Sequence, residues 1–321
     1  MMDKTQTSLH VGFILIDGLA LMSFAAATEP FRAANLLASR PLYKTTNIAV
    51  DGISATTSSG ARIPSDQRFD RHDPFDLIFV AAGGNPLAFD NRRTFAFLQR
   101  QAAHGVRLGG ISGGPVILAR AGLMAGRRMT VHWEHAPALS ALDPNLLLER
   151  SLYVIDRDRV TCAGGTAPMD LMHALIAETH GATFARDVSD WFLHTDVRPS
   201  AGPQRAGLIE RYGVTHPALV AAIEAMENSI ANPLGLSDLA RTTGVSERQL
   251  NRLFAAHLGR STMEFYRTLR LDTARKLLTG STLPITQIAL ATGFAGSAHF
   301  SRAVRAACGQ TPREIRAARA S

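Results

Sequence analysis

The stretch LSDLARTTGVSERQLNRLF, residues 236–254, has a related copy further along the chain, ITQIALATGFAGSAHFSRAV, residues 285–304. The two copies align Gly244 with Gly293, an offset of 49 residues (293 − 244), and Arg252 with Arg302, an offset of 50 (302 − 252). Self-similarity at a fixed spacing indicates that one supersecondary unit is used twice. This repeat therefore decides how the carboxyl-terminal part of the chain folds.

Each copy has the residue pattern of a helix-turn-helix. A short helix with apolar residues three positions apart, such as Leu236 and Leu239, is followed by a glycine that permits a tight turn. A second helix then presents Leu250 and Phe254 to the first helix, and Ser246 stands where an N-cap residue belongs. The pattern predicts two packed helical pairs in succession.

The outward face of each second helix carries side chains that can reach DNA. Arginine, asparagine and glutamine donate hydrogen bonds to base edges and phosphates when a helix lies in the major groove. We expect DNA contacts from Ser246, Arg248, Gln249, Asn251 and Arg252 in the first copy, and from Ser297, His299, Ser301, Arg302 and Arg305 in the second. Two solvated helical hairpins are the competing interpretation, and arginine at the matching position of both copies favours DNA.

The positive charge of the chain is concentrated in the repeated region. From Pro217 onward there are 13 Lys and Arg against 7 Asp and Glu, a net charge of +6 (13 − 7), whereas the preceding residues contribute +1 (21 − 20). A polyanion-binding module has such an excess. A basic membrane-surface segment is the alternative, but no single amphipathic helix carries a run of basic residues.

The carboxyl-terminal region resembles the AraC/XylS family of bacterial transcription regulators. The resemblance covers both helix-turn-helix units, a connecting helix expected over Phe265–Leu278, and the closing GQTPREI at residues 309–315. It implies a sequence-specific transcription regulator that binds double-stranded DNA with two helices in successive major grooves, about 34 Å apart. If the protein is an activator, RNA polymerase is a further expected partner.

The amino-terminal part alternates strands with helices. Compact apolar strands are expected over Leu9–Ile16, Leu77–Ala82 and Val106–Ile111, each followed by a helical pattern. The segment Ile53–Thr57 is expected to form a hairpin with a strand over Thr45–Val50. Alternation of this kind predicts an α/β fold, a parallel sheet with helices on both faces.

The chain is expected to have two domains joined by a linker. Residues 196–216 begin with the polar, turn-rich stretch DVRPSAGP, which is typical of a connection between domains. We therefore expect a ligand-sensing α/β domain over residues 1–195 and an all-α DNA-binding domain over residues 217–321.

A sharp turn from strand to helix, GGISGGP at residues 109–115, marks the candidate site of the first domain. Such an elbow lifts one side chain above the carboxyl ends of parallel strands, where ligands bind. It also directs the amides of a helix N-terminus to the same place. The candidate ligand-binding residues are Glu29, Gly83, Gly84, Ser112, Gly113, Gly114, His132 and Trp133.

The elbow, the segment EPFRAAN at residues 29–35 and the position of His132 together resemble the DJ-1/PfpI family, over about Leu9–Leu193. The resemblance implies a flavodoxin-like sandwich of the kind that serves as the sensor half of AraC-type regulators responding to arginine, carnitine or glycine betaine. We therefore expect a small effector that pairs a carboxylate with a nitrogen, with Glu29 facing the nitrogen. A homodimer formed through this domain is also expected.

Catalysis at the elbow is the main alternative. Enzymes of the DJ-1/PfpI family usually place cysteine where this chain has Ser112, and a serine nucleophile needs a well-aligned base. His132 could be that base, with Glu29 or Asp170 as its orienting acid, which would make the protein a hydrolase or amidase-like enzyme with a DNA-binding appendage. We expect instead a regulator without catalytic residues. A third alternative is a dimerisation scaffold with an empty elbow.

Two further patterns leave alternatives open. Trp133, Phe24 and Tyr43 could form an aromatic cage for a quaternary ammonium group, or they could belong to the core. The stretch HWEH at residues 132–135 has metal-ligand residue types, but its spacing matches no helical zinc motif. We expect neither a metal nor a cofactor.

The amino terminus and the cysteines favour a cytoplasmic protein. The first six residues, MMDKTQ, lack the apolar core of a signal peptide, and no uninterrupted apolar run is long enough to span a bilayer. Cys162 and Cys308 are far apart in the sequence and form no disulfide framework or metal-ligand spacing. We expect no membrane partner.

Overall fold

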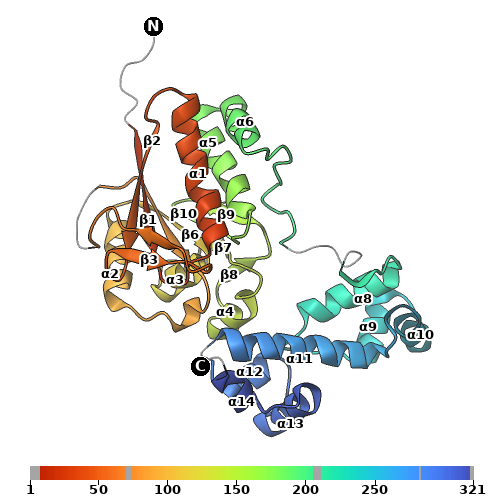
Figure 1. Ribbon diagram of the computed structural model, residues 1–321. Helices are drawn as coiled ribbons and strands as arrows, with labels where there is room; N and C mark the ends of the chain where they lie inside the picture. Colours follow the sequence, from red (N-terminus) through yellow and green to blue (C-terminus); the bar gives the residue numbers. More distant parts are fainter. Residues whose placement is uncertain (1–7, 70–73, 205–210, 282, 319–321) are drawn as a thin grey trace. The chain divides into compact units, whose positions relative to one another are not determined.

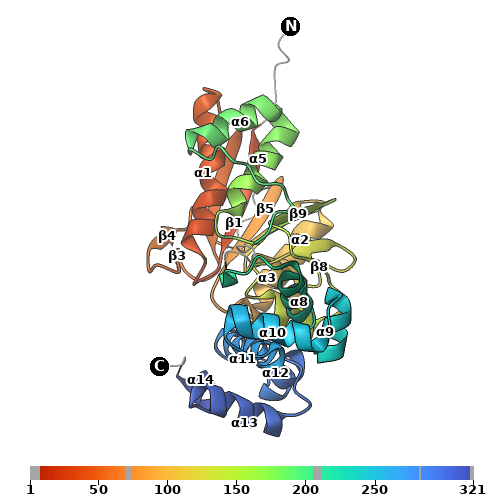
Figure 2. The same cartoon turned by 90° about the vertical axis from the view of Figure 1, so that its right-hand side faces the viewer.

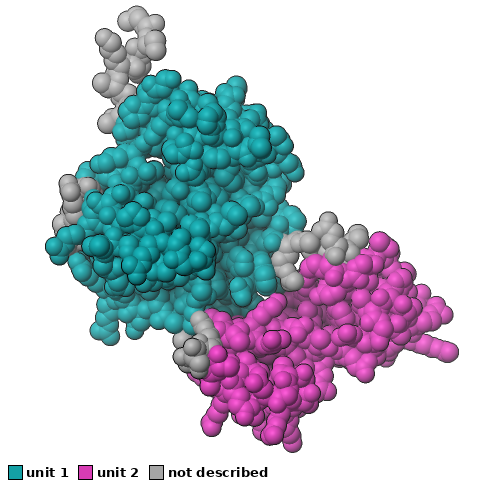
Figure 3. Space-filling view, in the orientation of Figure 1, with its two compact units in different colours: residues 1–204 teal, residues 205–321 magenta. Residues whose placement is uncertain are grey.

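The computed structural model describes residues 8–69, 74–204, 211–281 and 283–318 (Figure 1). The chain forms two compact units, residues 1–204 and 205–321 (Figure 3). In the described ranges, the first unit mixes strands with helices and the second unit contains helices.

The first unit is built on a six-stranded sheet with the strand order β2-β1-β5-β6-β10-β9. All neighbouring strands are parallel except β9 and β10. The strands are β1 (Leu9–Leu15), β2 (Tyr43–Ala49), β5 (Leu77–Ala82), β6 (Arg107–Ser112), β9 (Tyr153–Asp156) and β10 (Arg159–Cys162). Every residue of β5 is buried, as is usual for a parallel strand covered on both faces. The expected α/β fold with a mostly parallel sheet is confirmed.

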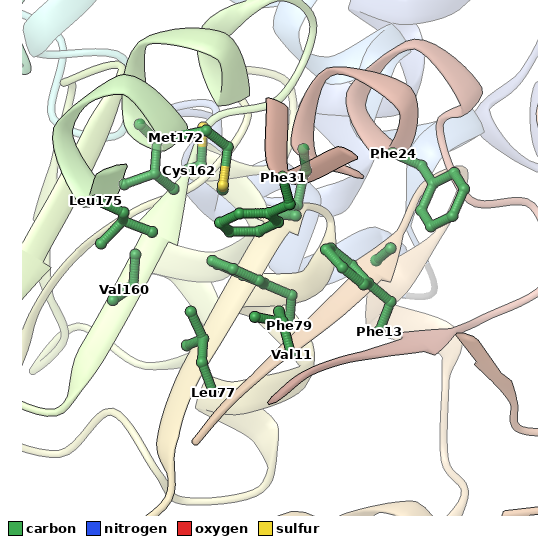
Figure 4. Packing of buried hydrophobic residues seen from close by; sticks show 14 of the residues in the cluster. Val11, Phe13, Phe24, Phe31, Leu77, Phe79, Val160, Cys162, Met172 and Leu175 are labelled. Carbon is green, nitrogen blue, oxygen red and sulfur yellow. The ribbon is translucent and has the colours of Figure 1, made fainter. Parts of the chain in front are cut away.

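Helices cover both faces of this sheet (Figures 1 and 2). One face carries α1 (Leu21–Leu37), α5 (Ala167–His180) and α6 (Ala182–Trp191), and the other carries α2 (Arg92–Ala103) and α3 (Gly114–Arg120). The strand order reverses direction after β2, so right-handed crossovers place α2 and α3 on the face opposite α1. The α1 face holds the aromatic core, in which the Phe13 and Phe79 rings stack with centroids 5.7 Å apart (Figure 4).

Shorter elements surround the carboxyl ends of the strands. They are β3 (Ser54–Thr56), β4 (Arg62–Pro64), η1 (Pro86–Ala88), β7 (Arg128–Thr130), α4 (Ala136–Leu142) and β8 (Leu147–Glu149). The expected hairpin between Ile53–Thr57 and the preceding strand is wrong, because β3 pairs with β4 instead. The Thr56 amide donates to Asp17 Oδ1 at 2.8 Å, and the Thr56 carbonyl accepts from the Gly18 amide at 2.7 Å, which ties β3 to the loop after β1.

A fully buried carboxylate holds part of the expected linker against the first unit. Asp170 on α5 accepts hydrogen bonds from Arg198 Nη2 at 2.6 Å, from Arg198 Nε at 3.0 Å and from His194 Nε2 at 2.8 Å. Because both partners follow α6, residues 194–204 fold back onto the unit. We call this segment, His194–Gln204, the strap.

The strap ends at Gln204, beside the strand that leads to His132. Gln204 Nε2 donates to the Ser151 carbonyl at 2.8 Å, to Thr130 Oγ1 at 3.0 Å and to the Val131 carbonyl at 3.1 Å. The linker expected over residues 196–216 therefore begins with nine residues, 196–204, that belong to the first unit. Turn-rich composition does not reveal such bonds, because their partners are distant in the sequence.

The second unit contains both copies of the repeat. Its helices are α8 (Pro217–Asn228), α9 (Leu236–Thr243), α10 (Glu247–Leu258), α11 (Thr262–Gly280), α12 (Ile285–Ala291), α13 (Ser297–Cys308) and α14 (Pro312–Ala317). Gly244 and Gly293 form the two tight turns in the left-handed region, with φ of 68° and 72°. The long helix α11 runs between the two helix-turn-helix motifs (Figure 1). Within the described ranges, no helix has both the length and the apolar composition needed to cross a membrane.

The elbow between β6 and α3 leaves no room for side chains at its glycines. A Cβ atom on Gly114 would lie 1.9 Å from the Val80 carbonyl oxygen, and one on Gly110 would lie 2.5 Å from the Pro115 nitrogen. Because the clashing atoms are backbone, they cannot rotate away. The glycines thus let α3 start directly on top of the sheet.

We expect Gly114→Ala to destabilise the first unit by about 3 kcal/mol, because overpacking against backbone forces the helix away from the sheet. Urea unfolding followed by tryptophan fluorescence measures this selectively, since both tryptophans, Trp133 and Trp191, lie in the first unit. Gly12→Ala is the control in the same unit, because its Cβ would meet only side-chain atoms, the nearest at 3.0 Å on the Phe75 ring. We expect it to lower the midpoint less than Gly114→Ala does. A Gly114→Ala midpoint equal to that of wild type would contradict this description of the elbow.

Candidate DNA interface and elbow site

Helix α10 presents long polar side chains to solvent and apolar ones to the unit. Arg248, Gln249 and Arg252 are exposed, whereas Leu250 and Phe254 are fully buried against α9 and α11. Ser246 Oγ accepts from the Gln249 amide at 3.2 Å, which is the N-cap expected from the sequence. The cap leaves the first turn of α10 ordered and its donors directed outward.

Helix α13 has the same division. Ser297, His299, Arg302 and Arg305 are exposed, Ser301 is half-buried, and Phe300 and Val304 are buried. Within the described residues, no ion pair joins a carboxylate to Arg248, Arg252, Arg302 or Arg305. These four cations are therefore available to a polyanion.

The structure gives Asn251 a role that the sequence did not suggest. Its Oδ1 accepts from the Thr262 amide at 3.1 Å and so caps the start of α11. In the second copy, Ser301 stands where the first copy has Asn251, and Pro312 stands where it has Thr262. Because proline has no N–H, the corresponding hydrogen bond cannot form there. Asn251 thus fixes the connection between α10 and α11, whereas Arg248, Gln249 and Arg252 have no such internal task in the described structure.

In the first unit, Ser112 stands at the end of β6 in a strained conformation. Its φ is 60°, in the left-handed region that non-glycine residues rarely adopt, and its side chain is buried. Gly164 passes so close that a Cβ there would lie 3.0 Å from Ser112 Oγ. The next residue, Gly165, donates its amide to Ser23 Oγ at 2.8 Å. Sequence reasoning missed Ser23, Gly164 and Gly165, although paired glycines after a buried strand were a usable signal.

The elbow offers fewer free amides than its sequence suggests. The Gly113 amide donates to the Ala82 carbonyl at 3.0 Å, and Pro115 has no N–H. The Gly113 amide is therefore not free to bind a ligand, because the neighbouring strand β5 accepts from it. Gly114 remains as the amide at the first position of α3.

His132 lies next to the elbow as an uncharged imidazole. Its amide donates to the Ser112 carbonyl at 3.5 Å, and burial lowers the pKa of its side chain. His132 Nδ1 accepts from the Glu134 amide at 3.4 Å, which assigns the ring proton to Nε2. The Trp133 ring lies beside it with centroids 5.2 Å apart, and burial lowers the pKa of His135 to about 4.

Several residues expected at the site lie elsewhere. Glu29 is ion-paired with Arg32 at 2.6 Å and stands six residues beyond Ser23, about 9 Å further along α1 and on another face. Asp170 is bound to the strap and not to His132. The aromatic-cage reading is wrong for two of its residues. Phe24 and Tyr43 are core residues that pack on Phe13 and Phe31.

The two glycines after β5 have separate roles. A Cβ on Gly83 would lie 2.5 Å from the Gly18 carbonyl oxygen, so Gly83 permits close approach of two loops. Gly84 is exposed with φ of 59° and has open space around it. Among the described residues, no cluster of three or more His, Cys, Asp or Glu is arranged to hold a metal ion.

A parallel α/β unit with a strained serine elbow, followed by two helix-turn-helix motifs, defines a DNA-binding protein with an attached α/β domain. Residues 11–178 match the DJ-1/PfpI family and residues 239–318 match a helix-turn-helix domain family. The chain is 46% identical over 308 residues to the HTH-type transcriptional regulator GlxA of Rhizobium meliloti, covering 96% of this chain and 95% of that protein.

A second relative, the HTH-type transcriptional regulator CdhR of Pseudomonas aeruginosa, is 40% identical over 95% of this chain and 90% of its own length. The crystal structure of an AraC family transcriptional regulator from Pseudomonas putida superposes with a TM-score of 0.51 at 26% identity, over 57% of this chain and 99% of that one. The chain belongs to the AraC-type helix-turn-helix transcriptional regulators that carry an amino-terminal DJ-1/PfpI domain.

We expect Arg252→Ala and Arg302→Ala each to weaken specific DNA binding by about tenfold, because a lost arginine–base contact costs about 1–3 kcal/mol. The measurement is fluorescence anisotropy with a duplex that the wild-type chain selects from a random-sequence pool. Arg241→Ala is the matched control, because Asp238 on the same helix already pairs with that guanidinium at 2.5 Å. Unchanged affinity in both Arg252→Ala and Arg302→Ala would show that α10 and α13 do not read DNA.

Proposed function

We propose that this regulator changes its DNA affinity when a small carboxylate-bearing, nitrogen-containing metabolite binds at the elbow, and that the first unit does no chemistry on it. The observation that carries the proposal is the position of Ser112. Its hydroxyl stands in a strained turn at the carboxyl end of β6, where ligands of open α/β sheets bind, beside an uncharged His132. Strain at such a position is a common mark of a functional site.

The donors near Ser112 suit a carboxylate. The Ser112 hydroxyl and the Gly114 amide are uncharged donors at the elbow, and His132 Nε2–H would supply a third if the bound ligand reaches that ring. A carboxylate can accept from several such donors at once. The nitrogen end of the ligand would face Trp133 and Glu134. Glu134 Oε2 lies 3.9 Å from His132 Nδ1 and takes the role first expected of Glu29. An aromatic face and a carboxylate together favour a cationic nitrogen.

The same geometry disfavours the enzyme alternative. A general base must lie within hydrogen-bond reach of the serine hydroxyl, and among the described residues no hydrogen bond joins a ring nitrogen of His132 to Ser112 Oγ. The neighbouring thiol of Cys162 is fully buried, and burial raises its pKa to about 12, which keeps it protonated. The close relatives are named as transcriptional regulators.

The strap provides a connection from the elbow to the start of the second unit. His132 donates to Ser112, and the preceding residue, Val131, accepts from Gln204, where the first unit ends. A ligand that moves the Thr130–Trp133 segment would therefore shift the residue from which the chain enters the second unit. Such a ligand alters DNA binding only if it favours one of two strap arrangements.

Each unit would have its own partners. The first unit would serve as the sensing and homodimerisation domain, and the second as the DNA-binding domain, in a cytoplasmic protein without a cofactor. RNA polymerase would be the third partner if binding activates transcription. A dimer would place four recognition helices on one operator, which suits direct or inverted repeats.

The test is calorimetric titration of arginine, carnitine and glycine betaine into the full chain. We expect Ser112→Ala to weaken binding of the active compound by about tenfold, because a hydrogen bond to a charged group contributes roughly 1.5–3 kcal/mol. Glu29→Gln is the control and should bind like wild type. Equal affinity in Ser112→Ala would place the ligand elsewhere, and turnover that Ser112→Ala abolishes would establish the enzyme alternative.

A further inference from the structure

Arg270 on α11 binds the turn of the second helix-turn-helix motif. Arg270 Nε donates to the Thr292 carbonyl at 2.8 Å, and Arg270 Nη2 donates to the Gly293 carbonyl at 2.6 Å. The guanidinium also lies over the Phe294 ring, 4.5 Å from its centroid. One planar group thus binds all three residues of the tight turn that precedes α13.

Tyr266, one helical turn earlier on α11, binds a second segment. Its hydroxyl donates to the Ser229 carbonyl at 2.7 Å and accepts from the Leu234 amide at 3.4 Å. The segment Ser229–Leu234 joins α8 to α9, the first helix of the first helix-turn-helix. From the same face of α11, Tyr266 therefore holds the segment that leads into the first motif, and Arg270 holds the turn of the second motif.

The two held segments are themselves in contact. A Cβ atom on Gly293 would lie 2.4 Å from Pro233 Cγ and 2.7 Å from the Ile230 carbonyl oxygen. The turn of the second motif thus rests directly on the Ser229–Leu234 segment, and only glycine fits between them. We call Tyr266, Arg270, Gly293 and the Ser229–Leu234 segment the junction.

The junction continues into the second recognition helix through Phe294. This ring is buried and packs edge-on against Phe300 and His299, with centroids 5.3 Å and 5.5 Å away. Both of these residues belong to the first turn of α13, the end of the helix that faces a groove in helix-turn-helix proteins. The orientation of α13 therefore depends on where Arg270 holds Phe294.

The first copy of the repeat lacks this enclosure. Gly244 has nearly the same φ as Gly293, 68° against 72°, but a Cβ on Gly244 would meet nothing within 4 Å. Both positions require a residue that adopts a positive φ, but only at Gly293 would a Cβ atom also clash with neighbouring atoms. This difference separates the junction from the ordinary chemistry of a tight turn.

We propose that Arg270 is a positioning residue that sets the spacing between the two recognition helices, by locking the turn of the second motif onto the segment that begins the first. The inference rests on the proposed reading of DNA by both α10 and α13. Arg270 binds the protein's own carbonyls, so its contribution to DNA affinity is indirect. It makes the two motifs a single rigid body that fits one groove-to-groove distance.

The test uses two duplexes and the full chain. The first duplex is selected by the wild-type chain from a random-sequence pool. The second is the same duplex with one base pair inserted between the two major grooves that the wild-type chain protects in a footprint. One added base pair turns one groove by about 35° relative to the other, so a rigid protein binds the second duplex at least about tenfold more weakly. We expect Arg270→Ala to bind the selected duplex about tenfold more weakly than wild type does. Its affinity for the duplex with the insertion should be less than about twofold lower than its affinity for the selected duplex.

Two further comparisons separate positioning from stability. Arg270→Lys should behave like Arg270→Ala, because one ammonium group cannot bind two carbonyls in a fork and stack on a ring. Gly293→Ala should also lose the spacing dependence, whereas Gly244→Ala should keep it whatever its overall affinity. Circular dichroism checks folding, and if Arg270→Ala does not fold, the other two junction variants carry the same comparison.

Three other results of this experiment would contradict the inference. If Arg270→Ala weakens both duplexes by one factor and keeps the wild-type spacing dependence, Arg270 only stabilises the fold and the inference is wrong. If the Arg270 variants bind both duplexes like wild type, it is wrong as well. If the wild-type chain itself shows no spacing dependence, reading by two rigid helices fails, and the inference fails with it.

Discussion

A carboxylate that is removed from water must be compensated by positive charge and hydrogen bonds. At Asp170, the residues that compensate it hold the strap against the first unit. Its two oxygens accept from Arg198 and His194, which lie beyond the last helix of the α/β unit. Removing Arg198 would take away the guanidinium that pairs with this buried carboxylate, so the strap is held with a strength that its polar composition does not suggest. The chain consequently leaves the first unit at Gln204, beside the segment that carries His132, and not at the end of α6.

The second unit solves a similar problem with different chemistry. Its two helix-turn-helix motifs share a core, yet their relative orientation also depends on polar contacts, in which Arg270 and Tyr266 satisfy backbone carbonyls of two separate segments. In both units a long-range polar contact thus decides where a segment lies, namely the strap in the first unit and the turn before α13 in the second. Apolar packing supplies the stability of each unit, and these contacts select one arrangement.

The elements of the fold could be predicted because their signals are local. The tight turns at Gly244 and Gly293, the N-cap at Ser246 and the buried strand β5 each depend on residues a few positions apart. Most of the failures involve distant partners, although the hairpin failed because β3 pairs with the nearby strand β4. Glu29 was expected near the elbow because of its helix, but the residue that α1 presents there is Ser23, bound to Gly165 across 142 positions of sequence. Asp170 among the apolar residues of the first turns of α5 was a readable sign of a buried ion pair, although the sequence could not identify Arg198 as its partner.

The central claim is that the elbow acts on DNA binding through the strap. The most direct measurement compares DNA affinity with and without a compound that binds the wild-type chain, in wild type and in Gln204→Ala. The account predicts that Gln204→Ala binds the compound within about twofold of wild type, while the compound no longer changes its DNA affinity, because coupling between two sites requires an element that both of them bias. A Gln204→Ala protein that keeps the full response to the compound would contradict the account.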